Sequence, residues 1–215
     1  MALPKHLSFL RRGSGGQCLE IFLDPICPAS ARAYHSITDN VLPLIDAGGK
    51  YHGQMSLVTR IYPHPVHYLA GFHTEALLLF GKTYPEQFWD YFGQIFGLMS
   101  KHGAVEGNEF TGNQIRDQLT ELAMEVAEKA NSIDKSSRAS KTKEFREKLV
   151  NIPPPSGRGP AENDVSKDLK YLVRVGRQNG IIVTLTGLFN GVRDDSISSS
   201  WGKDEWEKYL ASKLP

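Results

Sequence analysis

The residues with the clearest chemical potential stand together in the segment Asp24-Pro25-Ile26-Cys27-Pro28-Ala29-Ser30. A cysteine at the start of a helix meets unpaired backbone N–H groups and the positive end of the helix dipole, which stabilise a thiolate. Pro28 suits the first helical position, where its missing N–H has no partner to lose. Ser30 lies one turn further on, either as a hydrogen-bond donor to the Cys27 sulfur or as a neutral surface serine. The segment predicts a reactive thiol at Cys27; the alternative is an inert cysteine.

Histidines form the second group of candidates. His64 and His67 flank Pro65 directly after a predicted strand, while His35 and His73 lie elsewhere in the chain. Because an imidazole titrates near neutrality, His64 or His67 is a candidate general acid or base; the alternative is a structural role. No carboxylate or cysteine stands at a recognised ligand spacing from these histidines, so the sequence indicates no metal site.

Hydrophobic periodicity indicates the elements that position these residues. Strands are expected at 17–24 and 55–62, joined by a helix over 28–47 that Pro43 should kink, which gives a parallel βαβ unit. The later pattern predicts helices at 66–80, 85–101, 113–130, 135–149 and 164–178, a strand at 181–189, an Asn190-Gly191 hairpin with a return strand at 192–197, and a helix at 203–210. The aromatic residues of 85–101 are expected in the core, and residues 1–17 are expected to form a partly ordered tail.

Composition limits the function classes. The 215 residues include 40% hydrophobic and 23% charged residues, with a formal net charge of +1. No concentrated basic segment indicates a nucleic-acid partner, and no apolar run of about 20 residues indicates a membrane partner. Cys18 is expected in the core of the first strand, about 25 Å along the chain from Cys27, so no disulfide is expected. The two unpaired cysteines favour a cytoplasmic location.

The order of these elements, together with the Cys-Pro-Ala-Ser turn and the late Phe-Asn-Gly hairpin, resembles the DsbA-like branch of the thioredoxin superfamily. The turn is most similar to that of eukaryotic members with Asp-Pro-Val-Cys-Pro-X-Ser. The resemblance implies an α/β thioredoxin fold with an all-helical insertion: a thioredoxin-like domain of residues 14–65 and 161–215, and an insertion of residues 66–160. The same branch contains kappa-class glutathione transferases and chromene-carboxylate isomerases, which bind glutathione and small molecules on this scaffold.

The chain departs from the pattern of the family's oxidoreductases at two positions. These enzymes carry Cys-X-X-Cys, whereas Ser30 occupies the second cysteine position here, and a hydroxyl cannot form the disulfide. They also carry a cis-proline before the third strand, whereas Leu185 takes that position here. Because a cis bond before a non-proline residue costs about 3 kcal/mol, a trans bond and a different loop shape are expected. A dithiol oxidase or a disulfide isomerase is therefore not expected.

The implied topology indicates which residues meet. The parallel strands end at one edge of the sheet, and an antiparallel third strand starts there, so one cleft roofed by the helical insertion is expected at this edge. The predicted catalytic residues are Cys27, Ser30, His64 and His67; the predicted substrate-binding residues are Asp24, Pro28, Tyr62, Thr184, Leu185 and Thr186; no metal ligand is predicted.

These observations favour a protein with a single thiol at the active-site position, which acts on or binds a small molecule or glutathione; they favour an enzyme without establishing one. Two alternatives stay open: a cofactor-independent isomerase or lyase that uses the cleft histidines, and a non-catalytic thioredoxin-like binding module. No cofactor is expected beyond glutathione, which the resemblance leaves open. The sequence leaves monomer and homodimer equally open.

Overall fold

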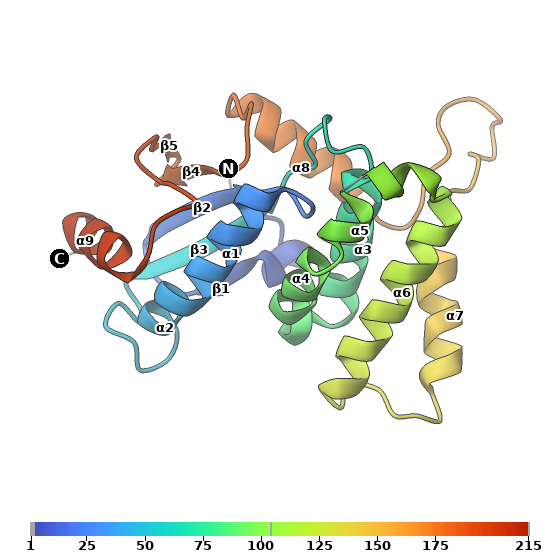
Figure 1. The fold of residues 1–215 in the computed structure, drawn as a ribbon, viewed down its shortest axis with the longest axis horizontal. Coiled ribbons are helices and arrows are strands. Elements are labelled where there is room, and N and C mark those ends of the chain that lie inside the picture. The colour runs from blue at the N-terminus through green and yellow to red at the C-terminus, as the bar shows by residue number, and fades with distance from the viewer. Residues whose placement is uncertain (1–2, 104, 215) are drawn as a thin grey trace.

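The structure is a computed structural model that describes residues 3–103 and 105–214. Its sheet has five strands in the order β1-β3-β2-β4-β5 (Figure 1). The strands are β1 (Arg11–Gly13), β2 (Gln17–Leu23), β3 (Met55–Ile61), β4 (Thr186–Phe189) and β5 (Val192–Arg193). β2 and β3 are parallel, β4 is antiparallel to β2, and β1 is antiparallel to β3. The predicted parallel pair and its antiparallel neighbour are confirmed.

Two helices, α1 (Pro28–Asn40) and α2 (Leu42–Ile45), connect β2 to β3. Cys27 has an extended backbone and caps α1, and Pro28 occupies the first turn. The helix breaks at Val41, directly before the turn that contains Pro43. The predicted break near Pro43 is confirmed, because a proline ring cannot continue a helix from the preceding turn.

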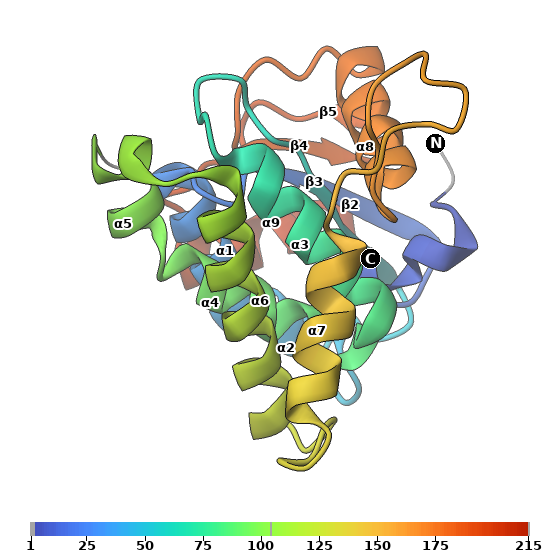
Figure 2. The ribbon, with the colours of Figure 1, turned by 90° about the vertical axis from the view of Figure 1, so that its right-hand side faces the viewer.

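The helical insertion follows β3. It contains α3 (Ala70–Thr83), α4 (Phe88–Phe96), α5 (Met99–His102), α6 (Gly112–Lys129) and α7 (Arg138–Lys148), with short 3₁₀ turns between some of them. Figures 1 and 2 show these helices packed beside the sheet rather than within it. The aromatic side chains of α4 are buried, as predicted: Phe88, Trp89, Tyr91, Phe92 and Phe96. None of the helices in the described part of the chain is long and apolar enough to span a membrane.

The central strands β2 and β3 are buried on both faces of the sheet. Alternate β2 residues Leu19, Ile21 and Leu23 enter the large core that the helical insertion shares. On the other face Phe22 packs with Tyr62 and with residues of α8 (Ser166–Gln178) in a smaller cluster. The same face holds a buried ion pair, in which Arg60 Nε lies 2.6 Å from Glu20 Oε2. The last helix, α9 (Lys203–Lys213), buries Trp206 and Leu210 in the large core.

The N-terminal segment differs from the predicted tail. A 3₁₀ helix over Lys5–Leu10 buries Leu7 and Leu10, and β1 then pairs with β3. His6 also contacts the Asp168 carboxylate of α8 at 2.8 Å. The expectation of a partly ordered tail is wrong, because Leu7 and Leu10 lie on the same side of this helix and are buried in the core.

Two other boundaries are corrected by the structure. The strand predicted at 181–189 begins only at Thr186, because Thr186 pairs with Phe22 and the chain beyond β2 turns away at Asp24. The helix predicted from residue 66 begins at Ala70, and Val66 and Tyr68 are exposed rather than buried. Both differences leave loops at the edge of the sheet where Cys27 lies.

Candidate functional site

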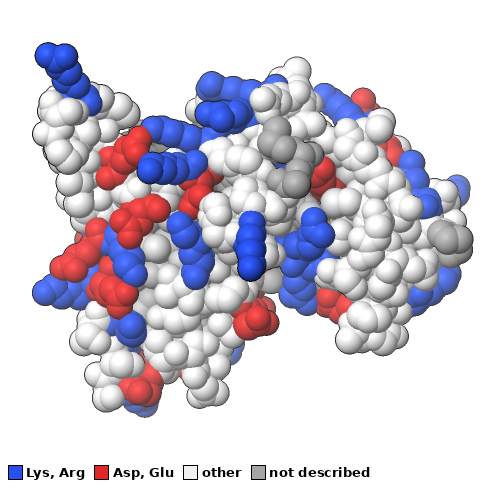
Figure 3. Space-filling view, turned by 180° about the vertical axis from the view of Figure 1, so that it is seen from behind, with Lys and Arg blue, Asp and Glu red and all other residues white. Residues whose placement is uncertain are grey.

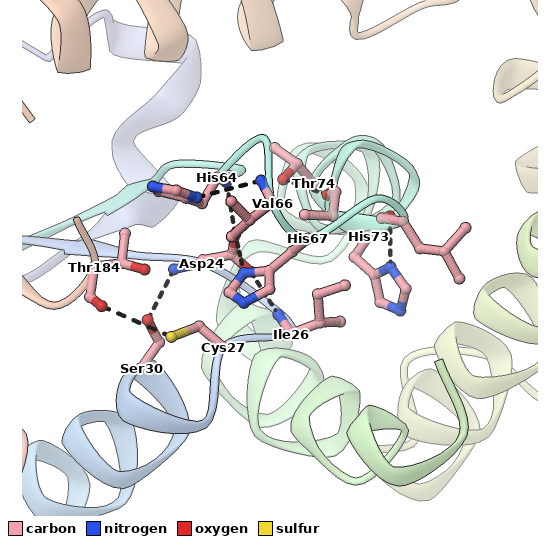
Figure 4. Close-up of polar contacts among 12 residues, drawn as sticks. Asp24, Ile26, Cys27, Ser30, His64, Val66, His67, His73, Thr74 and Thr184 are labelled. Atoms are coloured by element: carbon pink, nitrogen blue, oxygen red, sulfur yellow. Dashed lines mark hydrogen bonds and ion pairs between the residues drawn. The ribbon is translucent and has the colours of Figure 1, made fainter. Parts of the chain in front are cut away.

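Asp24 is the centre of the turn between β2 and α1. Its side chain is fully buried, and Oδ1 accepts a hydrogen bond of 2.9 Å from the backbone N–H of Ile26. Oδ2 accepts a hydrogen bond of 2.6 Å from the backbone N–H of His64 (Figure 4). One carboxylate therefore joins the turn that carries Cys27 to the loop that follows β3.

Ser30 closes the same turn from the first turn of α1. It is fully buried, and its Oγ accepts a hydrogen bond of 3.0 Å from the backbone N–H of Asp24. The sequence offered a bond to the Cys27 sulfur or a surface position, and the structure shows neither among the described contacts. Ser30 is a partner of the backbone, because the chain reverses here and leaves the amide of Asp24 facing the helix.

Ser30→Ala is expected to lower the free energy of unfolding by about 1 to 3 kcal/mol. The substitution leaves the buried N–H of Asp24 without an acceptor, and an unpaired buried donor costs this amount. Urea unfolding checks the value. Ser140→Ala is the matched control, because the Ser140 hydroxyl bonds a backbone carbonyl on an exposed helix. Equal stability of the two variants would contradict the role assigned to Ser30.

Cys27 lies at the head of α1 with 7% of its surface exposed. Its thiol donates to the backbone carbonyl of Thr184 over 3.7 Å. The predicted meeting of Cys27 with the segment before β4 is therefore confirmed. Pro28 is exposed beside Cys27, at the outer side of the turn.

The peptide bond between Thr184 and Leu185 is cis. The expectation of a trans bond is wrong. That expectation came from a local preference, whereas this backbone is held on both sides by the fold: Thr184 O accepts from the Cys27 thiol, and Thr186 pairs with Phe22. Leu185 is partly buried against the core, and the Thr186 hydroxyl donates to Val183 O.

Tyr62 takes a different place from the one predicted. Its ring lies in the cluster beneath α8, where a Cβ on Gly176 would approach the ring to 2.2 Å. Tyr62 follows Ile61 in the chain and so faces the opposite side of the sheet from the core that Ile61 enters. Its position favours packing over substrate binding.

The structure separates the roles of the two loop histidines. His64 Nε2 donates to Ile182 O at 2.7 Å, and Nδ1 accepts from the N–H of Val66 at 3.3 Å. Both ring nitrogens of His64 thus have backbone partners, and the side chain links the loops that follow β3 and α8. His64 acts as a structural bridge in this geometry.

His67 is directed toward the turn between β2 and α1 that carries Cys27. Its Nδ1 lies 3.0 Å from Asp24 Oδ2, in a contact whose angle does not make a hydrogen bond. Figure 4 shows the ring reaching from the loop toward the turn that carries Cys27. A quarter of the side chain is exposed, so it stays open to solvent. Of the two loop histidines, His67 is the one whose ring lies against the turn that carries Cys27.

A buried pair of histidines, His73 and His102, lies beside this site. His73 Nδ1 donates to Leu69 O at 2.9 Å, so its Nε2 must accept the 2.9 Å bond from His102 Nδ1–H. Burial lowers the pKa of His73 to about 4 and also lowers the pKa of His102. No sequence pattern predicts this pair, because the two residues are 29 positions apart and lie on different helices.

Three further features limit the chemistry that the described residues can perform: the second cysteine, the absence of a metal-binding cluster among them, and the position of a surface groove. Both cysteines are free, and Cys18 lies at the opposite end of β2 from Cys27. Cys18 is only half-buried, and burial raises the pKa of its thiol. No group of three or more His, Cys, Asp or Glu side chains in the described ranges could hold a metal ion. A groove of about 740 Å³ opens between α1, α4 and α6, and Cys27 does not line it.

The arrangement of the chain has parallels among solved structures. A candidate protein-disulfide isomerase from Pseudomonas syringae has a TM-score of 0.68 at 19% identity, covering 95% of this chain and 99% of its own. DsbA of Chlamydia trachomatis has a TM-score of 0.57 at 17% identity, with 99% and 93% covered. BdbD of Bacillus subtilis has a TM-score of 0.59 at 13% identity, with 95% and 91% covered.

The chain has the DsbA-like thioredoxin fold. The predicted fold class is confirmed, including the all-helical insertion. At these identities the likeness concerns the fold alone. A scan of protein-family models found no match, and a search of curated proteins found none either.

The mouth of the site carries an apolar rim. Val66, Tyr68, Ile182 and Val183 are each more than half exposed. They come from the two loops that His64 bridges through Ile182 O. We call these four residues the apolar rim. Two of its members, Ile182 and Val183, directly precede Thr184, whose carbonyl oxygen accepts from the Cys27 thiol.

Proposed function

We propose that the protein is a monothiol enzyme, in which Cys27 forms a reversible mixed disulfide with glutathione or a similar small thiol. The observation that carries the proposal is the setting of Cys27: the residue stands at the N-cap position of α1 and its thiol donates to Thr184 O, while Ser30 is bonded to the backbone N–H of Asp24. The apolar rim supplies contacts for the remainder of the thiol compound.

The proposed step is thiol–disulfide exchange with oxidised glutathione. The Cys27 thiolate attacks one sulfur, the disulfide of glutathione breaks, and a new bond joins Cys27 to that sulfur. The other glutathione leaves as a thiolate and takes up a proton, so Cys27 is oxidised and the leaving glutathione is reduced. Reduced glutathione reverses the step. His67, directed toward this turn by its contact with Asp24, accepts the thiol proton before the attack.

Oxidised glutathione is therefore expected to modify Cys27 and to leave Cys18 unmodified. Intact-protein mass spectrometry with peptide mapping measures the sites after incubation at neutral pH. Two matched cysteine variants identify the site. Cys27→Ser is expected to lose the modification. Cys18→Ser is expected to keep it, because burial raises the pKa of the Cys18 thiol and makes Cys18 the less reactive cysteine. His67→Gln is expected to slow the reaction at least about tenfold without changing its extent. Modification of Cys18 alone, or of neither cysteine, would overturn the proposal.

One observation favours a second candidate, a cofactor-independent isomerase or lyase. The ring of His67 lies 3.0 Å from the Asp24 carboxylate, and a small rotation of the ring would make the hydrogen bond by which a carboxylate orients a general base. Such an enzyme would act on a substrate held against the apolar rim, with the thiol as a bystander. Its signature is turnover that survives Cys27→Ala and is lost in His67→Gln, which is the reverse of the outcome expected for thiol exchange.

A further inference from the structure

The exposed side of α8 carries a single kind of charge. Lys167, Lys170, Arg174 and Arg177 are exposed, and the remaining exposed residue of the helix is Gln178. At 100° per residue these four side chains fall within about 80° of the circumference, and they extend over about 15 Å of the axis. We call them the basic row of α8. Figure 3 shows Lys and Arg side chains gathered on the upper part of this face of the molecule, where α8 lies.

The basic row is not neutralised by its own helix. The acidic residue of α8, Asp168, is buried and bonds His6 and Lys82 instead. Lys170 pairs with Glu162. Lys167 also attracts Glu162 and helps to lower the pKa of that carboxyl, but it makes no ion pair with it. Within the described ranges, Arg174 and Arg177 make no ion pair either.

Another helix of this chain shows the ordinary arrangement of exposed charges. On α7, Glu144 lies 3.0 Å from Lys141 and 2.7 Å from Lys148, and Lys143 faces Glu147 at 3.9 Å. Opposite charges three or four residues apart stabilise a helix, whereas like charges at this spacing destabilise it. The basic row of α8 therefore works against the helix that carries it, in a chain whose net charge is only +1.

We propose that the basic row of α8 is a docking surface for an acidic α-helical segment of a partner protein. Successive charges of the row stand three, four and three residues apart, which is about 4.5 to 6 Å along the axis. A partner helix with carboxylates at the same spacing faces all four cations at once, and its carboxylate competes with Glu162 for Lys170. An extended acidic strand presents side chains on one side about every 6.6 Å and falls out of step. The row shares no residue with the thiol site, so docking adds a function to that site and does not depend on it.

The experiment measures binding of two labelled peptides to the full chain by fluorescence anisotropy. The first is helical with glutamates at i, i+3, i+7 and i+10; the second has the same composition with its glutamates scattered around the helix. Arg174→Gln with Arg177→Gln is expected to weaken binding of the first peptide about tenfold at low ionic strength. Lys143→Gln with Lys208→Gln removes the same charge from other exposed helices and is expected to change binding less than about twofold.

Two further arms complete the test. Arg174→Lys with Arg177→Lys is expected to keep the affinity, which separates charge from folding defects. Equal affinity for the two peptides, or equal losses in the two glutamine variants, would overturn the proposal. Binding of vesicles of phosphatidylserine or of double-stranded DNA through the basic row, without binding of the aligned peptide, would assign the surface to another partner and also overturn it.

Discussion

Asp24→Ala is expected to lower the free energy of unfolding by about 3 to 5 kcal/mol. The fully buried carboxylate accepts from the N–H groups of Ile26 and His64, and alanine leaves both donors unpaired. An unsatisfied buried donor costs about 1 to 3 kcal/mol, and bonds to a charged acceptor are the stronger ones. Urea unfolding of the variant and the parent chain at neutral pH measures the difference.

Two comparisons make this prediction specific. Asp24→Asn keeps one carbonyl oxygen as an acceptor and should lose less stability than the alanine variant. Asp134→Ala removes an exposed carboxylate that also accepts from a backbone N–H, and its effect should be far smaller. If Asp24→Ala and Asp134→Ala unfold at the same urea concentration, Asp24 is not the residue that joins the two loops. The variant should also slow glutathione modification, since His67 loses its contact with Oδ2.

Local signals were enough to predict most of the fold. Apolar alternation placed β2 and β3, Pro28 marked the start of α1, and Pro43 marked its break. These features depend on neighbouring residues, so a single sequence contains them. The start of β4 does not: the β-branched residues from Ile181 favour a strand, yet strand pairing stops where β2 ends. The length of β4 is set by the length of its neighbour β2, which is known only once the sheet has assembled.

The sequence predicts which residues meet at the site, but it does not predict what each of them contacts there. The topology brought Cys27, His67 and Thr184 to one edge, as expected. The sequence could not distinguish His64 from His67, because both flank Pro65 and only the folded loops show which ring is bonded to Ile182 O. The partner of Ser30 differs from both predictions, the Cys27 sulfur and a surface position, for a related reason. Its partner, the N–H of Asp24, is a backbone group that no sequence motif displays.

Acidification is expected to destabilise the protein through His73 by about 3 kcal/mol between pH 6.5 and about pH 4. Burial lowers the pKa of His73 to about 4, whereas an imidazole in the unfolded chain titrates near 6.5. In this window His73 is protonated in the unfolded chain and still neutral in the folded chain. The free energy of unfolding therefore falls as the pH falls. The contribution is fully present above pH 6.5. His102, whose pKa is also lowered by burial, changes stability in the same direction.

Urea unfolding at a series of pH values measures this dependence, and a double variant isolates it. His73→Leu with His102→Leu removes both partners of the buried bond, so neither is left unpaired and the chain should still fold. The difference in stability between parent and variant should then shrink, or reverse in favour of the variant, as the pH falls from 6.5 to 4. His52→Gln removes an exposed imidazole that meets water in both states and should follow the parent curve. Parallel curves for the parent and the double variant would show that the two histidines bind equal numbers of protons in the folded and unfolded chains, and burial would then not lower the pKa of His73.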